Sequence, residues 1–140
     1  MKSRPMKVVV DTNVLISALL FTGRASEIVT LLENEDVVLV ISKDILEEYV
    51  RALAYPKFSL TEGEIKSLVG EVILPFAETV VASKLNKQAC RDRDDDKFLA
   101  CAKAAKADAI VSGDKDLLIL REFETIPVKD LSTFLQEFDR

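Results

Sequence analysis

Histidine is missing from the 140-residue sequence, and only two cysteines are present. Without an imidazole, the chain cannot use histidine as a general acid or base, form a serine–histidine triad or ligate zinc through histidine. Cys90 and Cys101 are too few for a zinc site or a disulfide framework, so we expect inert, buried thiols and a reducing compartment. Catalysis, if there is any, must use other side chains.

Long apolar runs, repeats and linkers are also absent. No window approaches 18 uncharged apolar residues, which excludes a membrane span, and Asp11 interrupts the first apolar stretch too early for a signal segment. Glycine and proline, four of each, are scattered singly, so no low-complexity tract separates parts of the chain. Because 49% of the residues are apolar, we expect a single domain over residues 1–140, soluble and cytoplasmic.

The apolar pattern alternates between two periods. Short continuous runs, typical of strands buried on both faces, lie at residues 8–10, 37–41, 79–82 and 109–112, with a weaker run at 125–128. Helical spacing occupies 14–34 (two helices broken near Gly23), 43–55, 61–76, 95–106 and 130–138, with Ser42 and Thr61 as caps and Pro56 as a stop. This alternation predicts a single-domain, three-layer α/β/α fold with a central parallel β-sheet.

Acidic residues gather where such a fold collects ligands, at the carboxyl ends of the strands. Asp11 directly follows the first strand, Glu47 and Glu48 lie on the helix after the second, and Asp114 and Asp116 follow the strand at 109–112. A further acidic run at 92–96 opens a helix. The sequence therefore predicts an acidic edge built from four distant segments.

Helix geometry selects among neighbouring acids. Asp95 lies close to the apolar face of its helix, whereas Asp96 points to solvent or serves the helix N-terminus. Glu47 is matched by Arg51 four residues later, an ordinary surface pair, which leaves Glu48 free for a pocket. Simpler structural explanations compete at several positions: Asp92, Asp94 and Asp96 suit an acidic helix cap, Asp116 suits a cap of the next turn, and Lys115 suits the surface.

A carboxylate placed like Asp11 costs several kcal/mol unless it has a partner, and no base stands beside it in the sequence. Converging carboxylates repel one another unless a cation lies among them. Oxygen-only ligands select Mg²⁺ or Mn²⁺, either of which lowers the pKa of bound water and neutralises charge on a phosphoryl oxygen. The residues alone thus predict Mg²⁺- or Mn²⁺-dependent phosphoryl chemistry, with one ion or two.

Four segments together resemble the signature blocks of the PIN-domain nucleases, in order and spacing across essentially the whole chain. They are residues 8–15 with Asp11-Thr12-Asn13, residues 42–49, residues 92–99 and residues 107–118. Ser112 stands where the family more often has threonine, and Arg93 where proline is common, but neither difference removes an acid.

The resemblance implies a metal-dependent endoribonuclease. It implies that Mg²⁺ or Mn²⁺ is held by Asp11, Glu48, Asp95 and Asp114, with Asp116 as a second choice in the last block, and that Asn13 and Ser112 orient these carboxylates. It is nearest to the small toxin components of toxin–antitoxin pairs, which implies an RNA substrate, a cognate antitoxin protein and a homodimer.

Two other interpretations stay open. The chain is a non-catalytic PIN-like scaffold that binds metal, RNA or protein, or it is a phosphatase or phosphoacceptor domain with Asp11 as nucleophile, although the Asp-x-Asp-x-Thr pattern is absent. The net charge of −5 is compatible with an RNA substrate, because bases outnumber acids once the clustered acids are set aside. Aromatic residues, 6% of the chain, form no aromatic-rich RNA-binding pattern, so we expect weak affinity for naked RNA.

Overall fold

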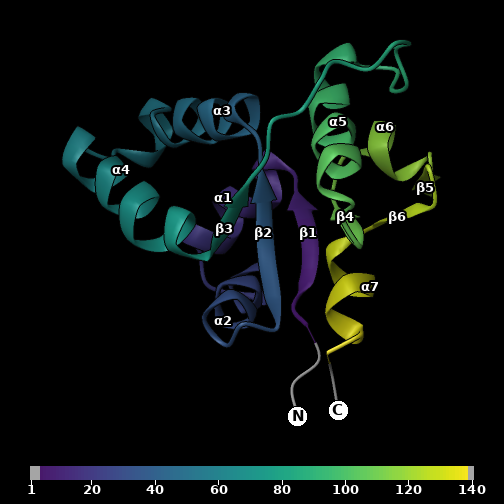
Figure 1. Ribbon diagram of the computed structural model, residues 1–140. Helices are drawn as coiled ribbons and strands as arrows, with labels where there is room; N and C mark the ends of the chain where they lie inside the picture. The colour runs from purple at the N-terminus through teal and green to yellow at the C-terminus, as the bar shows by residue number, and fades with distance from the viewer. Residues whose placement is uncertain (1–3, 139–140) are drawn as a thin grey trace.

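Six strands form one sheet in the order β3-β2-β1-β4-β6-β5 within residues 4–138, which the computed structural model describes (Figure 1). The strands are β1 (Met6–Val10), β2 (Val37–Ile41), β3 (Ala77–Thr79), β4 (Ala109–Val111), β5 (Glu122–Phe123) and β6 (Ile126–Lys129). Each neighbouring pair is parallel except β5 and β6, which are antiparallel. The sheet is therefore mostly parallel, as the alternating pattern predicts.

Helices cover both sides of this sheet and complete a three-layer α/β/α fold (Figure 1). They are α1 (Thr12–Leu20), α2 (Glu27–Glu33), α3 (Lys43–Leu53), α4 (Glu62–Leu68), α5 (Asp96–Ala105), α6 (Lys115–Leu118) and α7 (Leu131–Gln136), with short helical turns at Arg24–Ser26, Pro56–Phe58, Val69–Ile73, Leu74–Phe76 and Arg93–Asp95. No single helix in this part of the chain is long and apolar enough to cross a membrane.

Local signals explain most helix boundaries. Ser42 accepts the Ile45 N–H at 3.3 Å, and Thr61 forms a reciprocal capping box with Glu64, so both predicted caps are confirmed. The predicted break near Gly23 is confirmed as well: its φ of 132° is a conformation that side chains with a Cβ rarely adopt.

Several elements differ from the predictions. β3 ends at Thr79 instead of continuing to residue 82, because after Val80 donates to the Ile41 carbonyl at 2.9 Å the chain leaves the sheet and Val81 becomes 95% exposed. The segment at 61–76 is a chain of α, π and 3₁₀ turns. The short elements β5 and α6 have no predicted counterpart, since two to four residues give no readable period.

The core lies on both faces of the central strands. Val8–Val10 of β1, Leu39–Ile41 of β2 and Ala109–Val111 of β4 are completely buried, as continuous apolar runs predict. Tyr49 of α3 is also fully buried and donates its hydroxyl hydrogen bond to the carbonyl of Val10, the last residue of β1. This bond fixes α3 against the point where the chain enters the acidic edge.

Replacing Tyr49 with phenylalanine should lower the free energy of unfolding by about 1–2 kcal/mol, because the buried Val10 carbonyl loses this donor. Denaturant titration followed by circular dichroism measures the change. Tyr55→Phe is the matched control, since Tyr55 is 55% exposed and its replacement should leave stability within about 0.5 kcal/mol. Equal stabilities for the two variants would contradict a structural role for the Tyr49 hydroxyl.

Candidate metal centre

Asp11 is a buried carboxylate, 5% exposed, at the carboxyl end of β1. Its Oδ1 accepts the Val14 N–H at 2.9 Å, which caps α1. Its Oδ2 accepts the Ser112 hydroxyl and the Gly113 N–H, the latter at 3.0 Å. Burial raises the pKa of Asp11, and these hydrogen bonds oppose the rise. The partner that the sequence did not supply nearby comes from the loop after β4.

Ser112 connects two of the acids. Its hydroxyl donates to Asp11 and accepts the Asp114 N–H at 2.9 Å, and its side chain is completely buried. The orienting role expected for Ser112 stays a prediction, with which these two contacts are compatible. This arrangement follows from the register of β1 and β4, in which Val10 lies opposite Val111.

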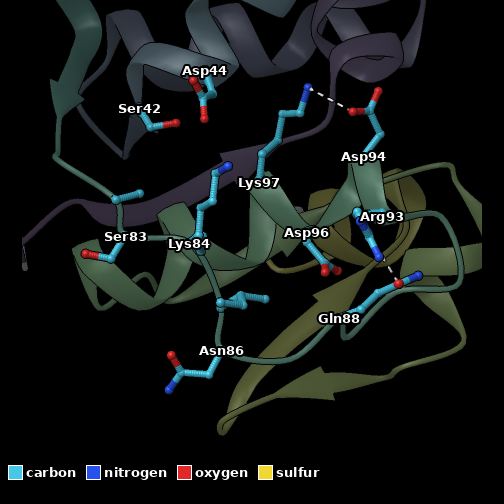
Figure 2. A pocket seen from close by; sticks show the side chains of 13 residues that line it. Ser42, Asp44, Ser83, Lys84, Asn86, Gln88, Arg93, Asp94, Asp96 and Lys97 are labelled. Atoms are coloured by element: carbon cyan, nitrogen blue, oxygen red, sulfur yellow. Dashed lines mark hydrogen bonds and ion pairs between the residues drawn. The ribbon is translucent and has the colours of Figure 1, made fainter.

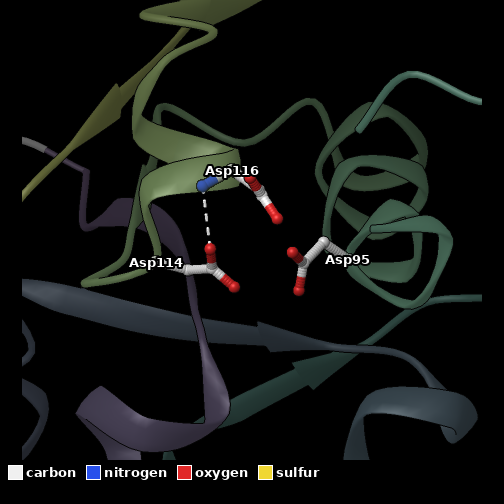
Figure 3. A group of neighbouring side chains, drawn as sticks. All are labelled: Asp95, Asp114 and Asp116. Atoms are coloured by element: carbon white, nitrogen blue, oxygen red, sulfur yellow. Dashed lines mark hydrogen bonds between the residues drawn. The ribbon is translucent and has the colours of Figure 1, made fainter. Parts of the chain in front are cut away.

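Asp95, Asp114 and Asp116 converge from the starts of two helices. Each offers one carboxylate oxygen, and the three oxygens lie within 4.8 Å of one another (Figure 3). Asp95 precedes α5, and Asp114 caps α6 by accepting the Asp116 N–H at 2.8 Å. Within residues 4–138, no lysine or arginine forms an ion pair with any of the three.

Asp95 is the least satisfied member of this group. It is 9% exposed, and its Oδ2 is buried without a hydrogen-bond partner among the described residues. Burial, followed by a side-chain hydrogen bond with Asp114 that favours the protonated carboxyl and by repulsion from Asp114, Asp92 and Asp116, raises the pKa of Asp95 to about 7. A buried, unpartnered oxygen among like charges is the environment in which a hard divalent cation is most stabilising. This donor set fits Mg²⁺ or Mn²⁺.

Glu48 is compensated differently. Its Oε2 accepts the Thr12 hydroxyl and its Oε1 accepts the Lys97 ammonium at 2.6 Å. Lys97 is only 15% exposed and also lies 3.8 Å from Asp94. Glu48 is not one of the three converging acids, and the expectation that it ligates metal stays a prediction. The sequence analysis missed Thr12 and Lys97, because their partner lies far away along the chain and no local spacing indicates it.

The remaining expected residues have mixed outcomes. Asn13 is exposed and makes no hydrogen bond to a carboxylate within residues 4–138, so its orienting role stays a prediction. Glu47 is exposed and forms no ion pair with Arg51 in the described chain, so the expected surface pair is wrong. Water screens exposed charges, so such a pair would contribute little to stability. Cys90 and Cys101 are buried, and burial raises the pKa of both thiols to about 12, consistent with inert side chains.

Asp96 does not point to solvent, the first of the two alternatives predicted for it. Its carboxylate accepts the N–H groups of Cys90 at 2.7 Å and Ala89 at 3.1 Å and thereby holds the preceding loop. It is also an acidic residue in the first turn of α5, as the second alternative expected. A helical wheel gives a direction relative to one helix and contains no information about a loop folded over it. Asp92 does act as a cap, since it accepts the Asp94 N–H at 2.9 Å.

A cavity of about 490 Å³ has none of the five predicted ligands in its lining, but it includes Asp94 and Asp96, the sequence neighbours of Asp95. It is bordered by the start of α3, the loop that follows β3 and the first turns of α5 (Figure 2). Its lining carries three bases and three acids as well as the hydroxyls of two serines: Lys84, Arg93, Lys97, Asp44, Asp94, Asp96, Ser42 and Ser83. Lys97 therefore belongs both to this cavity and to the ion pair with Glu48.

Comparison with known proteins gives two matches. The family model described as "PIN domain" matches residues 7–116, a range that contains every acid discussed above. An uncharacterised protein of Methanocaldococcus jannaschii is similar to this chain, with 32% identity over 151 aligned residues that cover 100% of this chain and 96% of the relative.

The pKa of Asp95 predicts how stability depends on pH in the metal-free protein. The folded protein keeps the Asp95 proton up to about pH 7, whereas the unfolded chain loses it near pH 4. The folded state thus binds more protons in between, and this residue makes the free energy of unfolding fall as pH rises from about 4 to about 7. Asp95→Asn should remove that fall.

Denaturant titrations at several pH values, with EDTA present, measure this effect. The advantage of Asp95→Asn over wild type should grow up to pH 7, reaching on the order of 1 kcal/mol after solvent screening, and then level off. Asp130→Asn is a control of opposite sign, because hydrogen bonds from Thr133 lower the pKa of Asp130. If the Asp95→Asn and wild-type curves run parallel, Asp95 ionises normally in the folded protein.

Proposed function

Because the chain belongs to the PIN-domain family, a family of nucleases, we propose that it is an endoribonuclease that hydrolyses RNA phosphodiester bonds with Mg²⁺ or Mn²⁺. Two observations carry this proposal: Asp95, Asp114 and Asp116 each bring one carboxylate oxygen to within 4.8 Å of the others, and the Oδ2 of Asp95 is buried without a hydrogen-bond partner among the described residues. Uncompensated charge of this kind destabilises the folded protein, whereas it attracts and stabilises a bound cation.

Each residue of the centre then has a physical task. Asp95, Asp114 and Asp116 would hold the ion, and Asp11 would lie beside them with its carboxylate fixed by Ser112, Val14 and Gly113. When bound, Mg²⁺ or Mn²⁺ supplies a water of lowered pKa and neutralises charge on the phosphoryl oxygens. Ser112 keeps Asp11 and Asp114 in a fixed relative orientation.

The cavity whose lining includes Asp94 and Asp96, on either side of Asp95 in the sequence, is the place that we propose for the substrate. Lys84 and Arg93 line it and form no ion pair within residues 4–138; Arg93 has only a long hydrogen bond, 3.5 Å, to Gln88. Both cations are thus available to phosphate oxygens of a polynucleotide. RNA, as opposed to DNA, is proposed on the resemblance to the ribonuclease members of the family.

The two alternative interpretations fare differently. Asp11 suits a nucleophile poorly, because three hydrogen bonds occupy its two oxygens and only 5% of the residue is exposed. A phosphatase that uses Asp11 is thus disfavoured. A scaffold without turnover remains one outcome of the experiment below. The role as a toxin that an antitoxin protein silences, and the homodimer, stay predictions that rest on the resemblance.

Purified protein should cut a labelled single-stranded RNA in the presence of Mg²⁺ or Mn²⁺ and not in EDTA. Asp114→Asn should reduce the rate by more than about 100-fold, because loss of a ligand exceeds the roughly 10–100-fold effect of residues behind the ligands. Asp108→Asn is the matched control. Asp108 immediately precedes β4, at the end of the strand opposite Asp114, and pairs with Arg4 and the Lys7 N–H. Its replacement should leave the rate unchanged.

Two results would contradict the proposal. Cleavage that persists in Asp114→Asn indicates a contaminating nuclease. Binding of RNA at saturating Mn²⁺ without any cleavage indicates a scaffold, and the acidic centre would then be retained for binding alone.

A further inference from the structure

The five predicted metal ligands separate into two groups that differ in how their charge is compensated. Asp95, Asp114 and Asp116 have no ion-pair partner within residues 4–138, whereas Glu48 is paired with Lys97 and Asp11 accepts three hydrogen bonds. We propose that the Lys97 ammonium is the second cation of this centre, so that the acids bind one divalent ion and Glu48 positions Lys97 instead of ligating metal. This inference rests on the proposed metal site and concerns how that site is built.

The first argument is that both oxygens of Glu48 are already occupied. Oε2 accepts the Thr12 hydroxyl, and Oε1 accepts the Lys97 ammonium at 2.6 Å. The side chains of Lys97 and Glu48 are 15% and 24% exposed, so water can solvate neither charge well if the ion pair is broken. Removing one partner of a largely buried ion pair leaves the other charge uncompensated, which is costly. A metal ion would have to displace Lys97 before it could reach Oε1.

The second argument concerns Asp11, which would have to share any second ion with Glu48. Its Oδ1 accepts one hydrogen bond and its Oδ2 accepts two, so three of about four acceptor positions are taken. The contrast with Asp95 is direct, because the Oδ2 of Asp95 has no partner among the described residues. Hydrogen bonds and an ion pair within the protein thus compensate the charges of Asp11 and Glu48. The charges of Asp95, Asp114 and Asp116 have no such ion pair within residues 4–138.

The third argument is the position of Lys97. It follows Asp95 by two residues at the start of α5, and it also borders the cavity proposed for the substrate (Figure 2). An ammonium held there between Glu48 and the cavity can donate to a phosphate oxygen without leaving Glu48, since it has three hydrogens. In nucleases with two metal ions, the second ion supplies such a charge about 3.5–4 Å from the first. Lys97 offers a fixed alternative.

The test counts bound ions. Isothermal titration calorimetry with Mn²⁺ should give one ion per chain for wild type and two for Lys97→Met, because Glu48 then lacks a cation and its freed oxygen, with the one acceptor position left on Asp11, can hold a second ion. Electron paramagnetic resonance of the loaded variant should show two coupled Mn²⁺ ions. Lys97→Arg keeps the charge and should give one. Lys103→Met, on the same helix and in an exposed pair 3.3 Å from Glu124, is the matched control and should also give one.

A second variant tests the inference even if Lys97→Met does not fold. Glu48→Gln keeps the shape and should still bind one Mn²⁺ with less than about threefold change in affinity, because Glu48 is not a ligand. If Glu48 were a ligand, affinity should fall by more than about 100-fold, beyond the usual effect of residues behind the ligands.

The outcomes separate this inference from the proposed function. Two ions bound by wild type, one ion bound by Lys97→Met at unchanged affinity, or a large loss of affinity in Glu48→Gln would each overturn the inference while the metal site stands. No Mn²⁺ bound by wild type would overturn the metal site and the inference together. One ion in wild type that is lost in Asp114→Asn, with the Lys97 and Glu48 results given above, supports both.

Discussion

Repulsion between buried carboxylates is the constraint on which this architecture depends. The parallel order of β2, β1 and β4 brings their carboxyl ends to one edge, and the chain places acids at or after each of these ends. Such a gathering would destabilise the fold unless donors or cations were supplied on the spot. Asp11 is tolerated because the loop after β4 and the first turn of α1 direct donors at both of its oxygens.

The compensation is uneven, and the unevenness points to function. A protein selected only for stability would be expected to satisfy Asp95 as it satisfies Asp11, since an unpartnered buried oxygen costs about 1–3 kcal/mol or more. Instead Asp95 has Asp114 and Asp116 as neighbours, and the pKa of Asp95 rises to about 7. Strongly perturbed acids of this kind cluster at functional sites.

The sequence predicted what local periodicity and strand edges determine. Apolar runs located the buried strands, the strand-end rule brought Asp11 and Asp114 to one edge, and the helical wheel turned Asp95 inward. The pattern could not predict Lys97, whose partner Glu48 is 49 positions away, because a contact of that kind depends on tertiary packing. The same limitation explains Asp96, which holds a loop that no helical wheel includes.

An acidic protein can act on a polyanion only where its own charge is neutralised. In the centre described here, Lys97 neutralises Glu48, hydrogen bonds stabilise Asp11, and Asp96 is occupied by backbone N–H groups. Asp95, Asp114 and Asp116, the proposed ligands, form no ion pair within residues 4–138, and Asp44 and Asp94 add negative charge to the lining of the cavity. Under the proposed function, metal and polynucleotide binding would be coupled by thermodynamic linkage, because the ion would remove repulsion that a phosphate meets, and each ligand would strengthen binding of the other.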